Sequence, residues 1–456
     1  MTVINVNGDS TAYGASSGSE TFVLNGYQNT VLLAGADDTV TLAGGGNDLV
    51  DLNSTGFNWA TTDSVDLGQG IYDSIISSHA LEGANVGIAS GYGETVVSLN
   101  NQNGVTSLSL GNQGDVVNQP GLGLNDIVTL NGDAANSVNF TNGSGAEVTI
   151  GTAGDGLSGY ASAVALYGAF NTLTGGDESF TATDQSGQNV LALGNGNNNL
   201  AFGGDQNSVA VGDGNNSIAF SGAFDTLSAG TGNNTLTTSS GHLHARFAAG
   251  GVGSTDVLNL GGNGNFIAGG SENFVIESGK GGVGLRLGNG NNTIAIGTGS
   301  VVLGMNAANQ GTNALEVSRG NAHVALNGGT DQVNLLDQKL GHDRVVLNGT
   351  QIGTNLTAQG SFDSITLTAD ANAAITETAV NGGLSLTVDG DHAGGIGTIS
   401  IDGLAQDDLA HINLVNLGTY TVTVDNTAQG GLTLHFSLGS IDLIGLQSIS
   451  NHLISG

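Results

Sequence analysis

Asparagine side chains recur at a fixed interval in the glycine-rich turns of this sequence, where they can accept and donate hydrogen bonds. The phrases GNGNN, GDGNN and GTGNN, between positions 193 and 236, place Asn198, Asn216 and Asn234 at equal intervals along the chain. Amides stacked at such an interval can hydrogen-bond to one another and close turns whose backbone groups would otherwise lack partners. We therefore expect these three residues to form a structural ladder.

A second set of polar residues lies midway between the first. Asn189, Asn207 and Asp225 occupy turns that lack the GxGNN phrase. Two unlike turns that alternate along the chain indicate one coil of about 18 residues, with two strands and two different edges. We expect the second set to form a ladder on the opposite edge.

Few residues are arranged in a way that suits catalysis. The segment GHLHARF brings His242, His244 and Arg246 together, as either a metal-binding pair of histidines or incidental residues of a loop. Enzymes on parallel β-helices use a basic residue beside carboxylates, but none of the six Lys and Arg residues lies in an acidic cluster. The sequence also lacks a nucleophile elbow and a phosphate-binding loop with its lysine. We expect no enzymatic activity.

Aliphatic residues with a period of nine define the elements that carry these turns. The series is Leu191, Leu200, Val209, Ile218, Leu227 and Leu236. Another apolar residue follows most of them after two positions, and residues two apart lie on the same face of a strand. Each repeat of the series is therefore a short strand plus a turn, and glycine collects where the chain turns sharply. The sequence predicts an all-β protein, a parallel β-solenoid with about 18 residues per coil.

The composition changes along the chain and suggests three segments. We expect a terminal strand or cap in residues 1–20 and a Gly/Asn-rich solenoid in residues 21–374, with loops inserted at 53–64 and 239–251. Residues 375–456 are more apolar and contain longer alternating runs. We interpret this last segment as a capping or assembly region, which a solenoid needs at its terminal edge.

Two stretches resemble a known repeat. AGGGNDLVDL, at residues 43–52, and GLGLNDIVTL, at residues 121–130, are similar to the glycine-rich nonapeptide of the RTX, or hemolysin-type, family. The resemblance implies a parallel β-roll, calcium held in the turns by aspartate and backbone carbonyl groups, and export by a type I system that reads an uncleaved C-terminal signal. It covers about two thirds of the chain in degenerate form and is specific at a handful of repeats.

The family's aspartate position corresponds to Asp38, Asp48, Asp126 and Asp225 of this sequence. Asp37, which precedes Asp38, and Asp213, in the phrase GDGNN, are further candidate calcium ligands, although an acidic pair such as Asp37–Asp38 also suits a solvated edge. At many repeats the position is asparagine instead: Asn189, Asn198, Asn207, Asn216, Asn234 and Asn292. Calcium prefers carboxylates, so only the turns with aspartate are expected to bind it.

The charge balance narrows the choice of partners. The chain has 39 acidic residues against 6 Lys and Arg, a formal net charge of −33. Such a chain repels nucleic acid and anionic lipid, and divalent cations are its natural counterions. No segment is apolar enough for membrane insertion, and no N-terminal signal is visible. The apolar, acidic end GSIDLIGLQSISNHLISG is typical of type I signals, so we expect an extracellular or cell-surface protein.

Three kinds of function remain open. The first is a secreted structural protein that binds to itself and builds a surface layer, filament or biofilm matrix, aided by calcium. The second is a calcium-binding adhesin that recognises a cell-surface glycan, and the third, less favoured, is a polysaccharide-active enzyme on a β-helix. Neither end of the sequence has the polar character of a solenoid cap, which favours assembly of the first kind.

Overall fold

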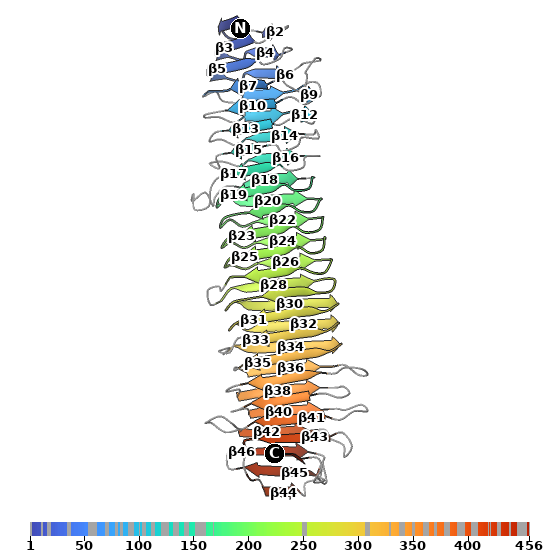
Figure 1. Cartoon of the computed structure of the whole chain (residues 1–456). Helices are drawn as coiled ribbons and strands as arrows, with labels where there is room; N and C mark the ends of the chain where they lie inside the picture. Colours follow the sequence, from blue (N-terminus) through green and yellow to red (C-terminus); the bar gives the residue numbers. More distant parts are fainter. Residues whose placement is uncertain are drawn as a thin grey trace. The chain divides into compact units, whose positions relative to one another are not determined.

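A computed structural model gives the fold of the protein. It describes residues 2–10, 12–15, 20–33, 38–52, 62–68, 73–77, 81–82, 85–89, 95–99, 101–102, 106–110, 115–119, 127–130, 136–140, 146–150, 161–166, 168–248, 253–305, 311–327, 330–336, 343–348, 352–358, 364–368, 372–377, 384–389, 397–402, 409–417, 419, 421–425, 430–436, 439–444 and 454–455. Within these ranges the chain forms strands and turns and no helix, in two compact units, Met1–Gly230 and Thr231–Gly456. In each unit the strands stack in parallel layers, which confirms the predicted β-solenoid (Figure 1).

The first unit contains two parallel sheets, which we call sheet A and sheet B. The strands of its sheet A, in order of pairing, are β1 (Thr2–Asn7), β3 (Glu20–Tyr27), β5 (Thr39–Gly46), β7 (Thr62–Asp66), β10 (Asn85–Ala89), β13 (Thr106–Leu110), β15 (Ile127–Leu130), β17 (Glu147–Ile150), β19 (Thr172–Gly175), β21 (Val190–Ala192), β23 (Ser208–Val211) and β25 (Thr226–Ala229). The strands of its sheet B are β2 (Ala12–Ala15), β4 (Thr30–Leu33), β6 (Leu49–Leu52), β8 (Asp73–Ile76), β11 (Thr95–Ser98), β14 (Val116–Gln119), β16 (Ser137–Phe140), β18 (Ala161–Leu166), β20 (Ser179–Asp184), β22 (Asn199–Phe202) and β24 (Ser217–Phe220). A separate pair is β9 (Leu81–Glu82) with β12 (Asn101–Gln102).

The second unit has the same two-sheet plan. The strands of its sheet A are β27 (His244–Phe247), β29 (Asn265–Ala268), β31 (Val283–Leu287), β33 (Val301–Met305), β35 (Ala322–Asn327), β37 (Arg344–Asn348), β39 (Ser364–Thr368), β41 (Leu384–Asp389), β43 (Leu409–Val415) and β47 (Ile454–Ser455). The strands of its sheet B are β26 (Thr235–Thr238), β28 (Thr255–Leu260), β30 (Asn273–Lys280), β32 (Asn292–Thr298), β34 (Thr312–Arg319), β36 (Thr330–Leu335), β38 (Ile352–Ala358), β40 (Asn372–Glu377), β42 (Gly397–Asp402), β46 (Gly439–Ile444), β45 (Gly431–Phe436) and β44 (Thr421–Asp425).

The core consists of rows of apolar side chains from successive coils. Strand β22 pairs with β24 in a register that sets Leu200 beside Ile218 and Phe202 beside Phe220, one coil further along the chain. All four side chains are buried, and the two phenylalanine rings stack with centroids 5.2 Å apart. The alternate residues of these strands face solvent. The period of two therefore decides which side chains build the core.

Glycine is required where neighbouring coils pass each other closely. A Cβ atom at Gly196 would overlap the carbonyl oxygen of Glu178, and one at Gly214 would overlap the carbonyl oxygen of Gly196. Both glycines belong to the GxGNN turns. The repeated phrase therefore reflects backbone contact between coils as well as turn geometry.

The length of a coil varies because residues are inserted between strands. Strand β20 pairs with β22 in the regular interval of the repeat (Thr181↔Asn199), whereas β6 pairs with β8 over a longer interval (Leu49↔Ser74). The prediction of a bulging loop at residues 239–251 is wrong in part, because His244–Phe247 form strand β27. Alternate residues of this strand, Ala245 and Phe247, are buried, so core packing holds the segment in the sheet.

The C-terminal residues combine both directions of pairing. Parallel pairing continues past residue 374 through β40–β42 and β41–β43. Strands β44, β45 and β46 then pair in antiparallel fashion, and β46 joins the solenoid by parallel pairing with β42. The change of composition near residue 375 thus precedes the change of topology, which begins at β44.

Candidate functional site

A column of buried polar side chains precedes the strands of sheet A in the first unit. The backbone N–H of Asn189 donates to Oδ1 of Asn207 over 3.1 Å, and the N–H of Asn207 donates to Oδ1 of Asp225 over 2.8 Å. Asn171 donates in the same way to Asn189 over 2.6 Å. Each acceptor therefore comes from the following coil, and asparagine and aspartate perform the same task.

A matching column precedes the strands of sheet B. Oδ1 of Asn198 accepts a hydrogen bond from the N–H of Phe180 over 3.0 Å, and Oδ1 of Asn216 accepts one from the Asn198 N–H over 3.2 Å. The Asn198 amide also donates to Oδ1 of Asn216 over 2.8 Å. Asn234, in the second unit, directs its N–H to Oδ1 of Asp256 over 2.8 Å. These amides lie inside the coils and not on an exposed edge, and we call the columns of both sheets together the inner ladder.

The inner ladder includes residues that the sequence analysis missed. Other members accept a backbone N–H from the preceding coil: Asp73, Asp115, Asn136, Asn265 and Asp343. Most of them directly precede a strand and stand two positions before its first buried aliphatic residue. Their position relative to the strand could have identified them in the sequence. They were missed because inserted residues shift them away from the regular spacing of the repeat.

Several members of the ladder are buried carboxyl groups with perturbed acidity. Burial raises the pKa of Asp73, Asp225, Asp256 and Asp331 from 3.8 to about 6, although the hydrogen bonds that they accept act in the opposite direction. The second oxygen, Oδ2, of Asp225 is buried and accepts no hydrogen bond within the described residues. These groups therefore change charge near pH 6, inside the folded coils.

The described ladder aspartates accept hydrogen bonds from backbone N–H groups. Oδ1 of Asp38 accepts the N–H of Glu20 over 3.0 Å, and Oδ1 of Asp48 accepts that of Asn29 over 2.7 Å. Calcium needs six to eight oxygen ligands, whereas no three His, Asp or Glu side chains converge anywhere in the described ranges. Asp37 and Asp126 lie outside the described residues. Calcium binding by the turns with aspartate stays a prediction.

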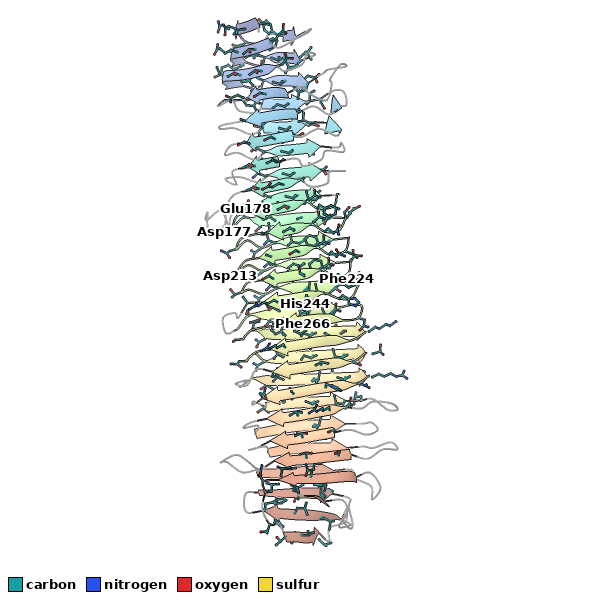
Figure 2. All side chains as sticks on the ribbon, in the orientation of Figure 1. Asp177, Glu178, Asp213, Phe224, His244 and Phe266 are labelled. Carbon is teal, nitrogen blue, oxygen red and sulfur yellow. The ribbon has the colours of Figure 1, made fainter. Side chains whose placement is uncertain are left out.

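A second, outer ladder runs along the GxGNN edge of the first unit. Oδ1 of Asp177 accepts the N–H of Asn195 over 2.9 Å, and Oδ1 of Asn195 accepts the N–H of Asp213 over 2.9 Å. Here the acceptor comes from the preceding coil, the reverse of the inner ladder. Asp213 is exposed, and Figure 2 shows it at the same edge as Asp177, with Phe224 at the opposite edge. Among the predicted cation ligands that the structure describes, Asp213 is thus the one exposed to solvent.

The three residues of the histidine and arginine cluster lie in two elements: His242 precedes strand β27, and His244 and Arg246 belong to it. His242 is exposed and has a φ of 62°, in the left-handed region, just before β27. His244 and Arg246 are alternate residues of β27 and both face solvent. His244 stacks on Phe266 with ring centroids 4.8 Å apart. The sequence did not indicate that β29 supplies this aromatic neighbour.

Comparison with known proteins assigns the chain to no family and no function. No protein-family model, curated protein or solved structure gives a significant match to the chain. The described residues include no helix that is long and apolar enough to cross a membrane.

Proposed function

We propose that this protein is a structural building block that associates with copies of itself into an extracellular layer, filament or matrix. The observation that carries the proposal is strand β44, which pairs only with β45 among the described residues. Its side chains Thr421 to Val424 are all exposed, including Val422 at 48% and Val424 at 61%. An exposed edge strand of alternating Thr and Val is a template for pairing with another chain.

The inner ladder supports the same proposal through rigidity. Described coils are tied to their neighbours by backbone pairing and by side chains such as Asn207, whose amide oxygen and nitrogen bond to the coils on either side. Coils that are held together in this way expose the same edge strand in every copy of the protein. Contacts between unlike surfaces of identical subunits propagate into open assemblies unless they close into a ring. Calcium enters this proposal as a counterion that reduces repulsion between chains of net charge −33.

Charged substitutions in β44 test the proposal. The double variant Val422→Lys/Val424→Lys places charge on the edge strand, and we expect it to stay monomeric where the unmodified chain forms large species in sedimentation velocity. Val190→Lys is the matched control, because Val190 is 46% exposed but lies on β21, which is paired on both sides. Equal assembly of the double variant and the control would contradict a role for β44.

The extracellular location is part of the proposal. It is supported by the resemblance of residues 43–52 and 121–130 to repeats of exported proteins. Cell fractionation of the producing organism checks it, with the protein expected in the medium or at the cell surface. Recovery in the cytoplasm alone would contradict this location and leave the assembly test unaffected.

A further inference from the structure

The positive charges of this acidic protein are confined to one part of the chain. All six Lys and Arg residues lie between Arg246 and Arg344. Three of them, Arg246, Arg286 and Arg344, belong to strands of sheet A in the second unit and are exposed. Such clustering in a chain with 39 acidic residues calls for a physical explanation.

The strand register aligns these residues on one surface, which we call the basic face. It consists of the outward residues of β27, β29, β31, β33, β35 and β37, and these strands contain no Asp or Glu. One column across the strands is His244, Phe266, Gly284, Val302, His323 and Arg344. The neighbouring column is Arg246, Ala268, Arg286, Gly304 and Ala325.

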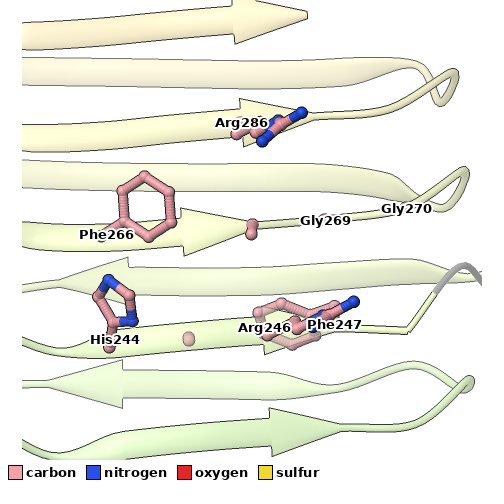
Figure 3. Close-up of a pocket in the computed structure, with 9 residues that line it drawn as sticks. His244, Arg246, Phe247, Phe266, Gly269, Gly270 and Arg286 are labelled. Atoms are coloured by element: carbon pink, nitrogen blue, oxygen red, sulfur yellow. The ribbon is translucent and has the colours of Figure 1, made fainter. Parts of the chain in front are cut away.

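A groove of about 670 Å³ lies at one end of the basic face. Arg246 and Arg286 both line it, and Ala268 and Gly269 form part of its floor. On its other side the His244 and Phe266 rings stack at an interplanar angle of 23° (Figure 3). A Cβ atom at Gly284 would come within 3.0 Å of Phe266 Cδ2, so glycine leaves room for this ring. The groove therefore joins two guanidinium groups to an aromatic platform.

We propose that the basic face binds an acidic polysaccharide, with the carboxylate or sulfate groups of the polymer at Arg246 and Arg286. Arginine binds such planar or multi-oxygen anions through paired N–H groups. The two arginines stand two strand layers apart, about 9.6 Å, which suits anionic groups repeated along a stiff polymer. The flat ring of Phe266 offers a stacking surface to the apolar face of a sugar ring.

A polysaccharide fits this face better than a second copy of the chain. Exposed carboxylates of a second copy, such as Asp213, can meet an arginine, but a sugar polymer also offers a flat apolar face to the Phe266 ring. The basic face is also separate from β44, whose exposed side chains are Thr and Val. The inference does not rest on self-assembly, and binding is measured on the assembly-deficient Val422→Lys/Val424→Lys variant so that each proposal fails separately.

Calorimetric titration of that variant tests the inference at about 0.1 M salt, where a Debye length of about 10 Å screens the more distant acidic residues. The probes are polygalacturonate, which carries carboxylates, dextran sulfate, which carries sulfates, and neutral dextran. We expect one or both anionic polymers to bind and neutral dextran not to bind. Adding Arg246→Gln and Arg286→Gln is expected to weaken binding about tenfold or more. Phe266→Ala is expected to weaken it severalfold without a change of charge.

Arg319→Gln is the matched control, because Arg319 is an exposed arginine at the end of β34 in sheet B. Loss of binding in this control to the same extent would show general charge attraction and overturn the assigned site. Absence of binding to both anionic polymers would also overturn it. If the two substitutions at Arg246 and Arg286 instead abolish self-association of the otherwise unmodified chain, the basic face binds a second copy and the polysaccharide proposal is wrong. Circular dichroism and melting of each variant show that these outward substitutions leave the fold intact.

Discussion

At the scale of single residues, the buried aspartates make stability depend on pH. The pKa of Asp225 rises from 3.8 to about 6 on folding because burial disfavours its charge, so between these values the folded chain binds more protons than the unfolded chain. Stability therefore increases as pH falls from about 7 towards 5. Asp73, Asp184, Asp256 and Asp331 contribute in the same direction. Denaturant unfolding at several pH values measures this slope, and higher stability at pH 7 than at pH 5 would contradict it.

The substitution Asp225→Asn separates charge from hydrogen bonding. Asparagine occupies the equivalent positions 189 and 207, so the variant keeps the acceptor for the Asn207 N–H and removes the buried charge. We expect it to be more stable than the unmodified protein at pH 7.5, by roughly 1–3 kcal/mol, with a gain that is about half as large near pH 5 and that disappears below about pH 3.8. An equal gain at both pH values would show that charge is not the cause.

Removing a ladder acceptor has the opposite effect. Asn207→Ala leaves the Asn189 N–H without its acceptor inside the coils, which costs about 1–3 kcal/mol of unfolding free energy. Ser208→Ala, at the adjacent exposed position, is the control and is expected to change stability by less than about 0.5 kcal/mol. Comparable losses in both variants would contradict a special role for the ladder.

At the scale of elements, the glycines of the turns govern how closely coils approach. Gly214→Ala introduces a methyl group that overlaps the carbonyl oxygen of Gly196 in the neighbouring coil. We expect a loss of about 1–3 kcal/mol or more, measured by chemical denaturation. Gly304→Ala is the control, because a Cβ atom there meets nothing within 4 Å. A larger loss for the control would mean that backbone flexibility, and not contact between coils, sets the requirement for glycine.

The sequence predicted the elements wherever its period is undisturbed. The inward positions of Leu200 and Ile218, and their alignment one coil apart, follow from alternation and from the repeated turn. Alignment of Arg246 with Arg286 did not follow, because the interval between β27 and β29 is longer than the interval between β29 and β31. Residues are inserted between β27 and β29, so the alignment of side chains across these strands cannot be predicted before their pairing register is known. The antiparallel strands β44 and β45 have the same alternating pattern as the parallel strands, so the sequence did not predict the direction of their pairing.

At the scale of the whole molecule, the net negative charge opposes the self-association that the exposed edge strand β44 favours. Residues 1–230 contain no Lys or Arg, and the chain as a whole has a net charge of −33. Repulsion of this kind extends over about 10 Å at 0.1 M salt and over about 30 Å at 0.01 M salt. Association through β44 is therefore expected to be weakest at low ionic strength. This dependence is opposite to that of polysaccharide binding by the basic face, which salt weakens.

The central claim is that this solenoid assembles with itself when its charge is screened. Sedimentation velocity of the full chain in low-salt buffer, in millimolar calcium and after chelation of calcium, tests it most directly. We expect large species in calcium, smaller species after chelation, and monomers for the Val422→Lys/Val424→Lys variant in both. An unmodified chain that sediments as a monomer at high concentration with calcium present would contradict the account.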